Sequence, residues 1–514
     1  MAETIFVGGG GEGYAMAQNL LLKFGNRHGL IAGATGTGKT VTLQVLAEGF
    51  SAAGVPVFMA DVKGDLSGIG VAGSVAHKLH EPFLKRAATI NHDLQYRAFP
   101  VTYWDLYGQQ GHPVRATVAE MGPLLLSRLL ELTEPQEGVM NVAFRLADEE
   151  DLPLLDLKDL QAMLTFISQH ETEISGRYGL VASASIGAIQ RRLLVLENQG
   201  ANEMFGEPAL DLADLMQLDA SGAGRINILA ADKLMNSPRL YATFLLWLLS
   251  ELFEELPEVG DADKPKLVFF FDEAHLLFTD APKALIAKVE QVARLIRSKG
   301  VGIYFITQNP ADVPEVILGQ LGNRVQHALR AFTARDQKDL RLASDTYRAN
   351  PRFVTEDAIR DVGTGEAVTS FLEAKGIPGI VERTLVRPPS SQLGPIAPEQ
   401  RAALMASSPM AVKYNTTLDR DSAFERLRAR AAKAAHESAA ENGTTAPAAG
   451  EDREFTNARR YDGGREATAP AKRSSGSRSD SIGEVFAKSF ARQLGSRSGQ
   501  AIIRGVLGSL FKRR

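Results

Sequence analysis

Short apolar runs alternate with longer helical patterns along the chain from Gly29 to about Val386. The runs are rich in β-branched and aromatic side chains, and several are apolar throughout, as strands buried on both faces of a sheet must be. We predict strands at His28–Ala32, Val55–Ala60, Val101–Trp104, Arg225–Leu229, Leu267–Phe271, Gly302–Thr307 and Val325–Ala331, and two late strands at Thr364–Ser370 and Ile380–Val386. This alternation indicates an α/β fold in which helices cover a mostly parallel sheet.

The pattern becomes helical between residues 118 and 197. Apolar side chains recur there three and four residues apart: Leu124, Leu125, Leu129 and Leu130, then Leu160, Met163, Leu164 and Ile167. Because this spacing gathers apolar side chains on one helix face, we predict an inserted helical subdomain at 118–197. The sheet domain then comprises 29–117 and 198–398, preceded by an N-terminal segment, 1–28, and followed by a helical extension, 399–428.

The C-terminal part differs in composition. Residues 429–481 are rich in Ala, Gly, Ser, Arg and Glu with few large apolar side chains, so we predict a disordered linker. Residues 482–514 show two apolar stripes at helical spacing, and Lys472–Arg514 holds ten Lys or Arg against two acids. We favour a strap that packs on a neighbouring subunit, while a membrane-surface helix and a DNA-binding tail stay open.

Composition narrows the class of protein. The 514 residues are 44% hydrophobic, which is enough for a substantial core, and the formal net charge of −4 argues against polyanion binding by bulk electrostatics. The absence of cysteine excludes disulfides and thiolate chemistry. Neither a secretory leader nor an apolar run of roughly 18 residues is visible, so we expect a cytoplasmic protein and consider membrane association unlikely.

One glycine-rich segment follows the first predicted strand and precedes a helical pattern. It reads Gly33-Ala34-Thr35-Gly36-Thr37-Gly38-Lys39-Thr40 and matches the phosphate-binding P-loop pattern. Glycines allow successive backbone N–H groups to point at phosphate oxygens, aided by the positive end of the following helix. Lys39 would bridge the β- and γ-phosphates, and Thr40 would offer its hydroxyl to Mg²⁺. We therefore expect ATP and Mg²⁺ as ligands.

Two further strands end in residues that suit hydrolysis. Asp272 and Glu273 directly follow the strand Leu267–Phe271, and Gln308 follows Gly302–Thr307. Asp272 would hold Mg²⁺ directly or through water, Glu273 would orient and deprotonate the attacking water, and Gln308 would sense the γ-phosphate or position water. A kinase of small metabolites needs no such water-activating base, which disfavours that alternative.

The order of these motifs resembles the HerA–FtsK superfamily of ring-forming motor ATPases, most closely its bacterial YjgR-type branch. Two more segments contribute: Asp61-Val62-Lys63-Gly64-Asp65 after the second strand, and Arg294-Leu295-Ile296-Arg297-Ser298-Lys299-Gly300 before the strand that ends at Thr307. The resemblance implies a P-loop fold of the added-strand, catalytic-glutamate type. It also implies a homo-oligomer, a hexameric ring, and ATP-driven translocation along double-stranded DNA or pumping of another polymer.

Family roles transfer unevenly to this chain. Lys39, Thr40, Asp272, Glu273 and Gln308 fall on family positions. The arginine that acts on a neighbouring subunit's ATP best matches Arg297, with Arg294 and Arg324 as competitors. An ordinary surface or intersubunit ion pair is the alternative for each of them. The second segment, Asp61 to Asp65, faces the nucleotide side, but its pattern does not distinguish a metal contact from a purely structural role.

One departure from the family bears on the polymer that is moved. HerA carries an N-terminal β-barrel that serves assembly and partner docking, whereas only about thirty residues precede Gly33 here. A nuclease partner is therefore not implied, and DNA translocation follows less securely than ATP hydrolysis. The alternative is a protein-remodelling or nucleotide-regulated scaffold ATPase. A basic loop that points into the ring pore would favour the DNA translocase over this alternative, and the candidates for it are Lys85-Arg86 and Arg191-Arg192.

Overall fold

A single twelve-stranded sheet organises the chain. The computed structural model describes residues 3–260, 262–278 and 283–441. The strand order is β2-β1-β12-β11-β10-β3-β9-β8-β4-β7-β5-β6. The strands are β1 Thr4–Gly10, β2 Met16–Leu21, β3 Gly29–Ala32, β4 Val57–Asp61, β5 Val101–Asp105, β6 His112–Pro113, β7 Ile226–Ala230, β8 Leu267–Phe271, β9 Val301–Thr307, β10 Asn323–Gln326, β11 Glu366–Ser370 and β12 Glu382–Val386.

Neighbouring strands are parallel from β10 to β6 and antiparallel from β2 to β10. The predicted α/β fold with a mostly parallel sheet is confirmed. β9 pairs with β3 on one side and with β8 on the other. It therefore separates the strand before the P-loop from the strand before Asp272 and Glu273, which is the added-strand arrangement that the resemblance implies.

The central strands are buried on both faces. Phe269 and Phe271 of β8 face one apolar core, and Val268 and Phe270 between them face a second core. Helix α1 (Lys39–Ala52) packs its apolar side chains into the second core, and α9 (Pro238–Glu255) packs into the first. This two-sided burial explains why the strands read as continuous apolar runs.

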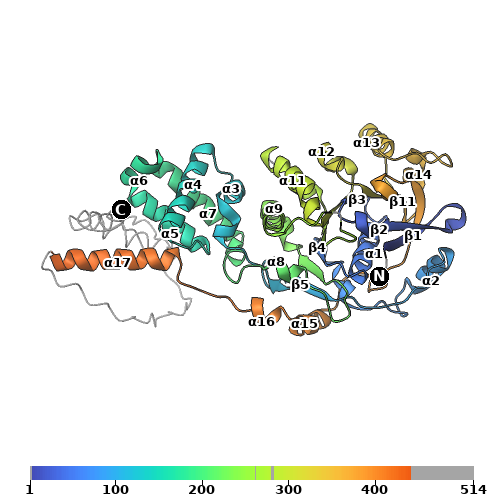
Figure 1. Ribbon diagram of the computed structural model, residues 1–514, viewed down its shortest axis with the longest axis horizontal. Coiled ribbons are helices and arrows are strands. Elements are labelled where there is room, and N and C mark those ends of the chain that lie inside the picture. The colour runs from blue at the N-terminus through green and yellow to red at the C-terminus, as the bar shows by residue number, and fades with distance from the viewer. Residues whose placement is uncertain (1–2, 261, 279–282, 442–514) are drawn as a thin grey trace, which may run out of the picture.

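The remaining helices fall into two groups. Those around the sheet are α2 His80–Thr89, α8 Leu212–Leu215, α10 His275–Phe278, α11 Lys283–Leu295, α12 Glu315–Leu318, α13 Ala334–Asp345, α14 Thr355–Asp361, α15 Pro398–Ala406 and α16 Ala411–Tyr414. Those of the helical body are α3 Val118–Leu129, α4 Glu134–Glu149, α5 Leu157–Gln169, α6 Glu171–Tyr178, α7 Ser183–Asn198 and α17 Ala423–Glu441. Figure 1 shows the helical body at one end of the molecule and the sheet at the other.

Helix α17 ties the C-terminal part of the described chain to the helical body. It packs along α5. The buried Asp159 carboxylate of α5 accepts the N–H of Phe424 at 2.8 Å and so caps the beginning of α17. The predicted linker at 429–481 therefore begins too early, because α17 continues to Glu441. Its alanine-rich composition favours a helix once a partner covers its apolar face. Residues 442–481 and the predicted helices at 482–514 lie outside the described residues.

The pattern of the first 28 residues did not predict strands β1 and β2. Strand β1 contains the run Gly8–Gly10, and glycine runs are typical of loops. In the fold, a Cβ on Gly8 would lie 2.2 Å from the carbonyl oxygen of Leu385 in β12. Only glycine permits such close pairing, so the residues that hide the strand from sequence reasoning are those that allow it to join the sheet.

The predicted strand Val325–Ala331 is shorter than expected. Strand β10 begins at Asn323, two residues earlier than predicted, and ends at Gln326. The His327 N–H still donates to the carbonyl oxygen of Ala32 in β3 at 2.7 Å, while the His327 side chain packs on the P-loop. Among the described residues no single helix is long and apolar enough to cross a membrane. One bent pair, α6 with α7, meets the length and composition criteria together, with an angle of 102° between its members.

Candidate functional site

The P-loop occupies the turn between β3 and α1. Gly36 and Gly38 have φ values of 78° and 116°, a region that other residues rarely adopt, and they turn the chain so that Lys39 begins α1. The Lys39 Nζ atom donates to the carbonyl oxygens of Gly33 at 2.6 Å and Ala34 at 3.1 Å. The first N–H groups of a helix lack intrahelical partners, so this loop presents donors suited to phosphate oxygens.

His327 supports the P-loop from the neighbouring strand. A Cβ on Gly33 would lie 2.5 Å from His327 Cβ, so the two backbones touch here. One imidazole nitrogen, Nε2, lies 2.8 Å from the hydroxyl oxygen of Thr42 in α1, and the other, Nδ1, lies 3.0 Å from the carbonyl oxygen of Glu366. A neutral ring satisfies both contacts, with Nδ1 donating and Nε2 accepting. Burial lowers the pKa of His327 to about 4.

His28 is a second buried histidine of the same kind, at the beginning of β3. Its Nε2 lies 2.6 Å from the carbonyl oxygen of Ala293, and its Nδ1 accepts the N–H of Ile303 at 3.0 Å. Burial, with repulsion from Arg297, lowers the pKa of His28 to about 4. Both histidines therefore contribute stability only while they are neutral.

The stability that these two histidines contribute should consequently be lost as the pH drops from 6.5 toward 4. In this window the unfolded histidines bind protons before the folded ones, so each histidine is expected to cost about 2 kcal/mol of unfolding free energy at pH 5. Urea denaturation at pH 7 and pH 5 measures the change. Asp61 and Asp272, whose pKa values are raised, make the folded protein more stable as the pH drops. The change in the free energy of unfolding between pH 7 and pH 5 is therefore compared between wild type and His28→Asn, in which only the contribution of this histidine is missing. A wild-type loss no larger than that of His28→Asn would contradict the assignment to His28.

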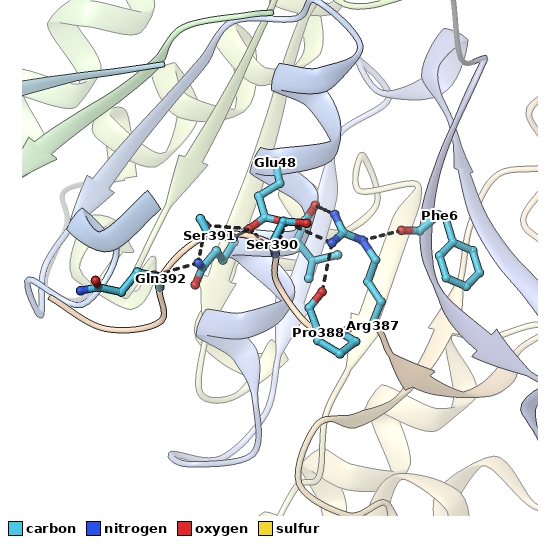
Figure 2. Close-up of polar contacts among 9 residues, drawn as sticks. Phe6, Glu48, Arg387, Pro388, Ser390, Ser391 and Gln392 are labelled. Atoms are coloured by element: carbon cyan, nitrogen blue, oxygen red, sulfur yellow. Dashed lines mark hydrogen bonds and ion pairs between the residues drawn. The ribbon is translucent and has the colours of Figure 1, made fainter. Parts of the chain in front are cut away.

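A buried ion pair anchors the helix behind the P-loop. Glu48 of α1 is 1% exposed and accepts from Arg387 Nη1 at 3.1 Å and from the N–H groups of Ser390 and Ser391, each at 2.9 Å. The Arg387 Nε atom also donates to the carbonyl oxygen of Phe6 in β1 at 3.1 Å. Figure 2 shows these contacts, which join α1, the first strand and the segment after β12.

The acidic pair follows β8, at the same edge of the sheet as the P-loop. Asp272 and Glu273 are both buried, and Glu273 adopts a φ of 47°, which is uncommon for a residue with a side chain. The Glu273 N–H donates to Asp272 Oδ1 at 2.9 Å. The pair also interacts electrostatically with Lys39, so the P-loop lysine and both predicted acids share one site.

Three side chains surround the Glu273 carboxylate. Lys63 Nζ lies 2.6 Å from Oε1, while Gln308 Nε2 donates to Oε2 at 3.4 Å and His275 Nδ1 lies 3.3 Å from Oε2. The structure thus brings Gln308 to Glu273, as the site prediction requires. The structure adds Lys63 and His275 to the residues that the sequence predicted for this site. The sequence pattern gave Lys63 no clear role, and it gave His275, which follows the acidic pair, no function.

Four carboxylates crowd this edge of the sheet. Burial and the neighbouring Glu273 raise the pKa of Asp272 to about 6, and burial with repulsion from Asp65 raises the pKa of Asp61 to about 7. Burial raises the pKa of Asp65 as well. The pKa of Glu273 is lowered: burial would raise it, but the contact with Lys63 prevails. Burial and repulsion from Lys63 lower the pKa of Lys39. A cation would be stabilised by this excess of acids.

The residues present fit Mg²⁺ and a nucleotide. Asp65 Oδ1 is a buried oxygen without a hydrogen-bond partner, and Thr40, the predicted hydroxyl ligand, interacts with the same side chain. Although four carboxylates lie near one another here, no three His, Asp or Glu side chains among the described residues are arranged so that they could hold a metal ion together. Mg²⁺ in nucleotide sites keeps several waters and binds one or two protein ligands plus phosphates. Thr40 and Asp272 would therefore suffice as its protein ligands.

Arg297 lies at the opposite edge of the sheet. It stands just before β9, whereas Gln308 follows that seven-residue strand, so the two are separated by roughly 20 Å at the strand rise per residue. Arg297 is therefore remote from the P-loop of its own chain. Arg294 pairs with Glu290 one helical turn earlier. Arg324 donates to the carbonyl oxygens of Leu321 at 3.0 Å and Leu318 at 2.9 Å, which indicates a structural role.

The candidate basic pairs lie on helices α2 and α7 and not in loops, and one arginine of each pair is engaged in the fold. Arg86 of α2 donates to the carbonyl oxygens of Thr364 at 3.1 Å and Gly365 at 3.4 Å, and the Gly365 N–H in turn donates to Thr37 of the P-loop at 2.8 Å. Arg192 contacts the carbonyl oxygen of Leu130. Lys85 and Arg191 are exposed. Arg86 therefore supports the P-loop rather than pointing to a polymer.

The sequence matches the family described as helicase HerA-like C-terminal over residues 12–514. The chain belongs to this HerA-like family. The resemblance to the HerA–FtsK superfamily is thereby confirmed, whereas assignment to the YjgR-type branch stays a prediction. No curated protein matches this HerA-like chain.

Solved structures with a similar fold include the plasmid coupling protein TrwB and the protein VirB4. The plasmid coupling protein TrwB, in complex with a non-hydrolysable ATP analogue, is 14% identical with a TM-score of 0.50, over 77% of this chain and 92% of that chain. The structure of TrwB with ADP and Mg²⁺ is 15% identical with a TM-score of 0.49, over 76% of this chain and 92% of that chain. VirB4 of Thermoanaerobacter pseudethanolicus is 14% identical with a TM-score of 0.48, over 78% of this chain and 98% of that chain. At these identities the likeness concerns the fold alone.

Proposed function

We propose that this HerA-like protein hydrolyses ATP as a ring-forming motor, a hexamer, and couples hydrolysis to translocation on double-stranded DNA in the cytoplasm. The observation that carries the proposal is the convergence of Lys39, Asp272, Glu273 and Gln308 at one sheet edge. Family membership and the P-loop fold shared with TrwB, which binds an ATP analogue, support it.

Each residue has a distinct role in this proposal. The N–H groups of residues 33–40 bind the phosphates, and Lys39 leaves its contacts with Gly33 and Ala34 to bridge the β- and γ-phosphates. Mg²⁺, held by Thr40 and Asp272, would neutralise phosphate charge. Glu273 accepts a proton from the attacking water, and Gln308 orients that water. Because the site lies at the sheet edge with Gln308 exposed, a neighbouring subunit has access to it.

Arg297 is proposed to complete the site of the adjacent subunit. A subunit carrying Arg297→Ala keeps its own P-loop, and one carrying Lys39→Ala keeps its arginine. Each variant alone should lose nearly all ATPase activity. Lys39→Ala lacks the lysine that bridges the phosphates, and Arg297→Ala lacks an arginine that, aimed at the γ-phosphate, is worth on the order of 10³-fold or more in rate. Mixing the two should restore part of the activity, measured as phosphate release. The absence of any rescue at all mixing ratios would exclude action in trans by Arg297.

The experiment that tests the motor itself is the ATPase rate with and without duplex DNA, at several stated salt concentrations. A DNA translocase should hydrolyse ATP faster on DNA, and its DNA affinity should fall with rising salt because phosphate contacts release counterions. Hydrolysis that is unaffected by DNA, together with no salt-sensitive binding, would favour the protein-remodelling ATPase instead. In that case the helical body, α3 to α7 with α17, would be the surface to test for protein binding.

A further inference from the structure

The loop that follows β4 is held rigidly beside the acidic pair. The Asp61 carboxylate accepts the N–H groups of Asp65 at 3.2 Å and Leu66 at 3.0 Å, and Gly64 provides the turn with a φ of 73°. Ser67 Oγ donates to the carbonyl oxygen of Gly64 at 3.2 Å. These contacts fix the backbone on both sides of Lys63, so the lysine emerges from a well-defined turn.

The Lys63 ammonium group makes the shortest contact to the Glu273 carboxylate. It lies 2.6 Å from Oε1, while the other oxygen is approached only at 3.3 Å and 3.4 Å by His275 and Gln308. The Glu273 side chain is 5% exposed and that of Lys63 is 43% exposed. An ordinary surface ion pair has two hydrated partners, whereas here the acid is buried and only the lysine reaches solvent.

We propose that Lys63 is a positioning residue for ATP hydrolysis, which holds the Glu273 carboxylate by Oε1 so that Oε2 faces the attacking water. The inference rests on the proposed function and extends it to a residue in the loop after a different strand, β4. The segments that follow β4, β8 and β9 supply the four residues: Lys63 follows β4, Glu273 and the first residue of α10, His275, follow β8, and Gln308 follows β9. A carboxylate on a side chain with several rotatable bonds needs such fixed donors to keep one oxygen directed at the water.

The lysine's surroundings support a positioning role over phosphate binding. Lys63 interacts with three acids, Glu273, Asp272 and Asp65, and it repels Lys39. Lys39 is the lysine that the P-loop presents to phosphate. Lys63 instead stands on the acidic side of the site, where its charge offsets the carboxylates and its short contact selects one orientation of Glu273.

The test compares Lys63→Met and Lys63→Arg with the wild-type full-length protein in steady-state ATP hydrolysis. Lys63→Met should lower kcat about 10- to 100-fold with KM for ATP within about twofold, because a misplaced base slows chemistry without weakening ground-state binding. Lys63→Arg, which keeps a donor, should retain most of the activity. Lys338→Met, an exposed lysine of α13, serves as the matched control and should behave as wild type.

A double variant separates positioning from a structural effect. Lys63→Met combined with Glu273→Gln should be no slower than Glu273→Gln alone, since Lys63 then has no base to orient. Thermal melting checks folding, and Lys63→Gln provides a second, polar replacement. Wild-type kcat in both neutral variants, a multiplicative double-variant loss, or a loss confined to KM would each overturn the inference. A wild-type protein that hydrolyses no ATP would overturn the proposed function itself, and the inference with it.

Discussion

Replacing Glu273 with glutamine is expected to abolish ATP turnover while ATP binding persists. The amide keeps the size of the side chain but cannot accept the proton of the attacking water, and loss of a general base costs about 10²- to 10⁴-fold in rate. The P-loop and Lys39 are untouched, so the affinity for ATP should stay within a few-fold of wild type. Single-turnover hydrolysis and equilibrium binding of a fluorescent ATP analogue measure the two quantities.

The control for this experiment is Glu173→Gln, an exposed glutamate on α6 in the helical body. It removes one negative charge from the chain as Glu273→Gln does, but it lies outside the site and should hydrolyse ATP at the wild-type rate. Turnover by Glu273→Gln within a factor of two of wild type would rule out Glu273 as the base. Loss of ATP binding together with turnover would show instead that the acid supports the nucleotide site.

Replacing Arg387 with methionine is expected to lower the free energy of unfolding by about 3 kcal/mol or more. The substitution leaves the Glu48 carboxylate, 1% exposed, without its charged partner, and breaking a buried ion pair on one side costs about 3–5 kcal/mol. It also removes donors from the carbonyl oxygens of Phe6 and Val45. Urea denaturation of the full-length protein measures the loss.

A double-mutant cycle identifies the cause of that loss. Glu48→Met combined with Arg387→Met removes both charges, and an apolar replacement of a buried pair is often close to neutral. The double variant should therefore be more stable than the sum of the two single losses predicts. Additive losses would indicate that the arginine acts through its backbone contacts, shown in Figure 2, and not through Glu48. Either result would show which contacts of Arg387 hold α1 in place, and with it Lys39 and Thr40.

The sequence by itself determined the parallel sheet and the chemical core of the site. Strands buried on both faces must be apolar throughout, so β8 and β9 are visible as runs, and the polar residues that end them, Glu273 and Gln308, stand out by contrast. The P-loop is similarly local, because its glycines and Lys39 are consecutive. Family membership followed from the order of these motifs, before any contact between distant segments was known.

Only the tertiary structure decided which neighbours these residues have. The contact between Lys63 and Glu273 joins loops far apart in the sequence, and the charge pattern around Lys63 alone does not reveal it. The burial of Gly8–Gly10 against β12 and the extension of α17 to Glu441 depend likewise on partners from distant segments. Local patterns report which residues must be buried or must turn the chain, whereas the pairing of charges depends on how the sheet brings its loops together.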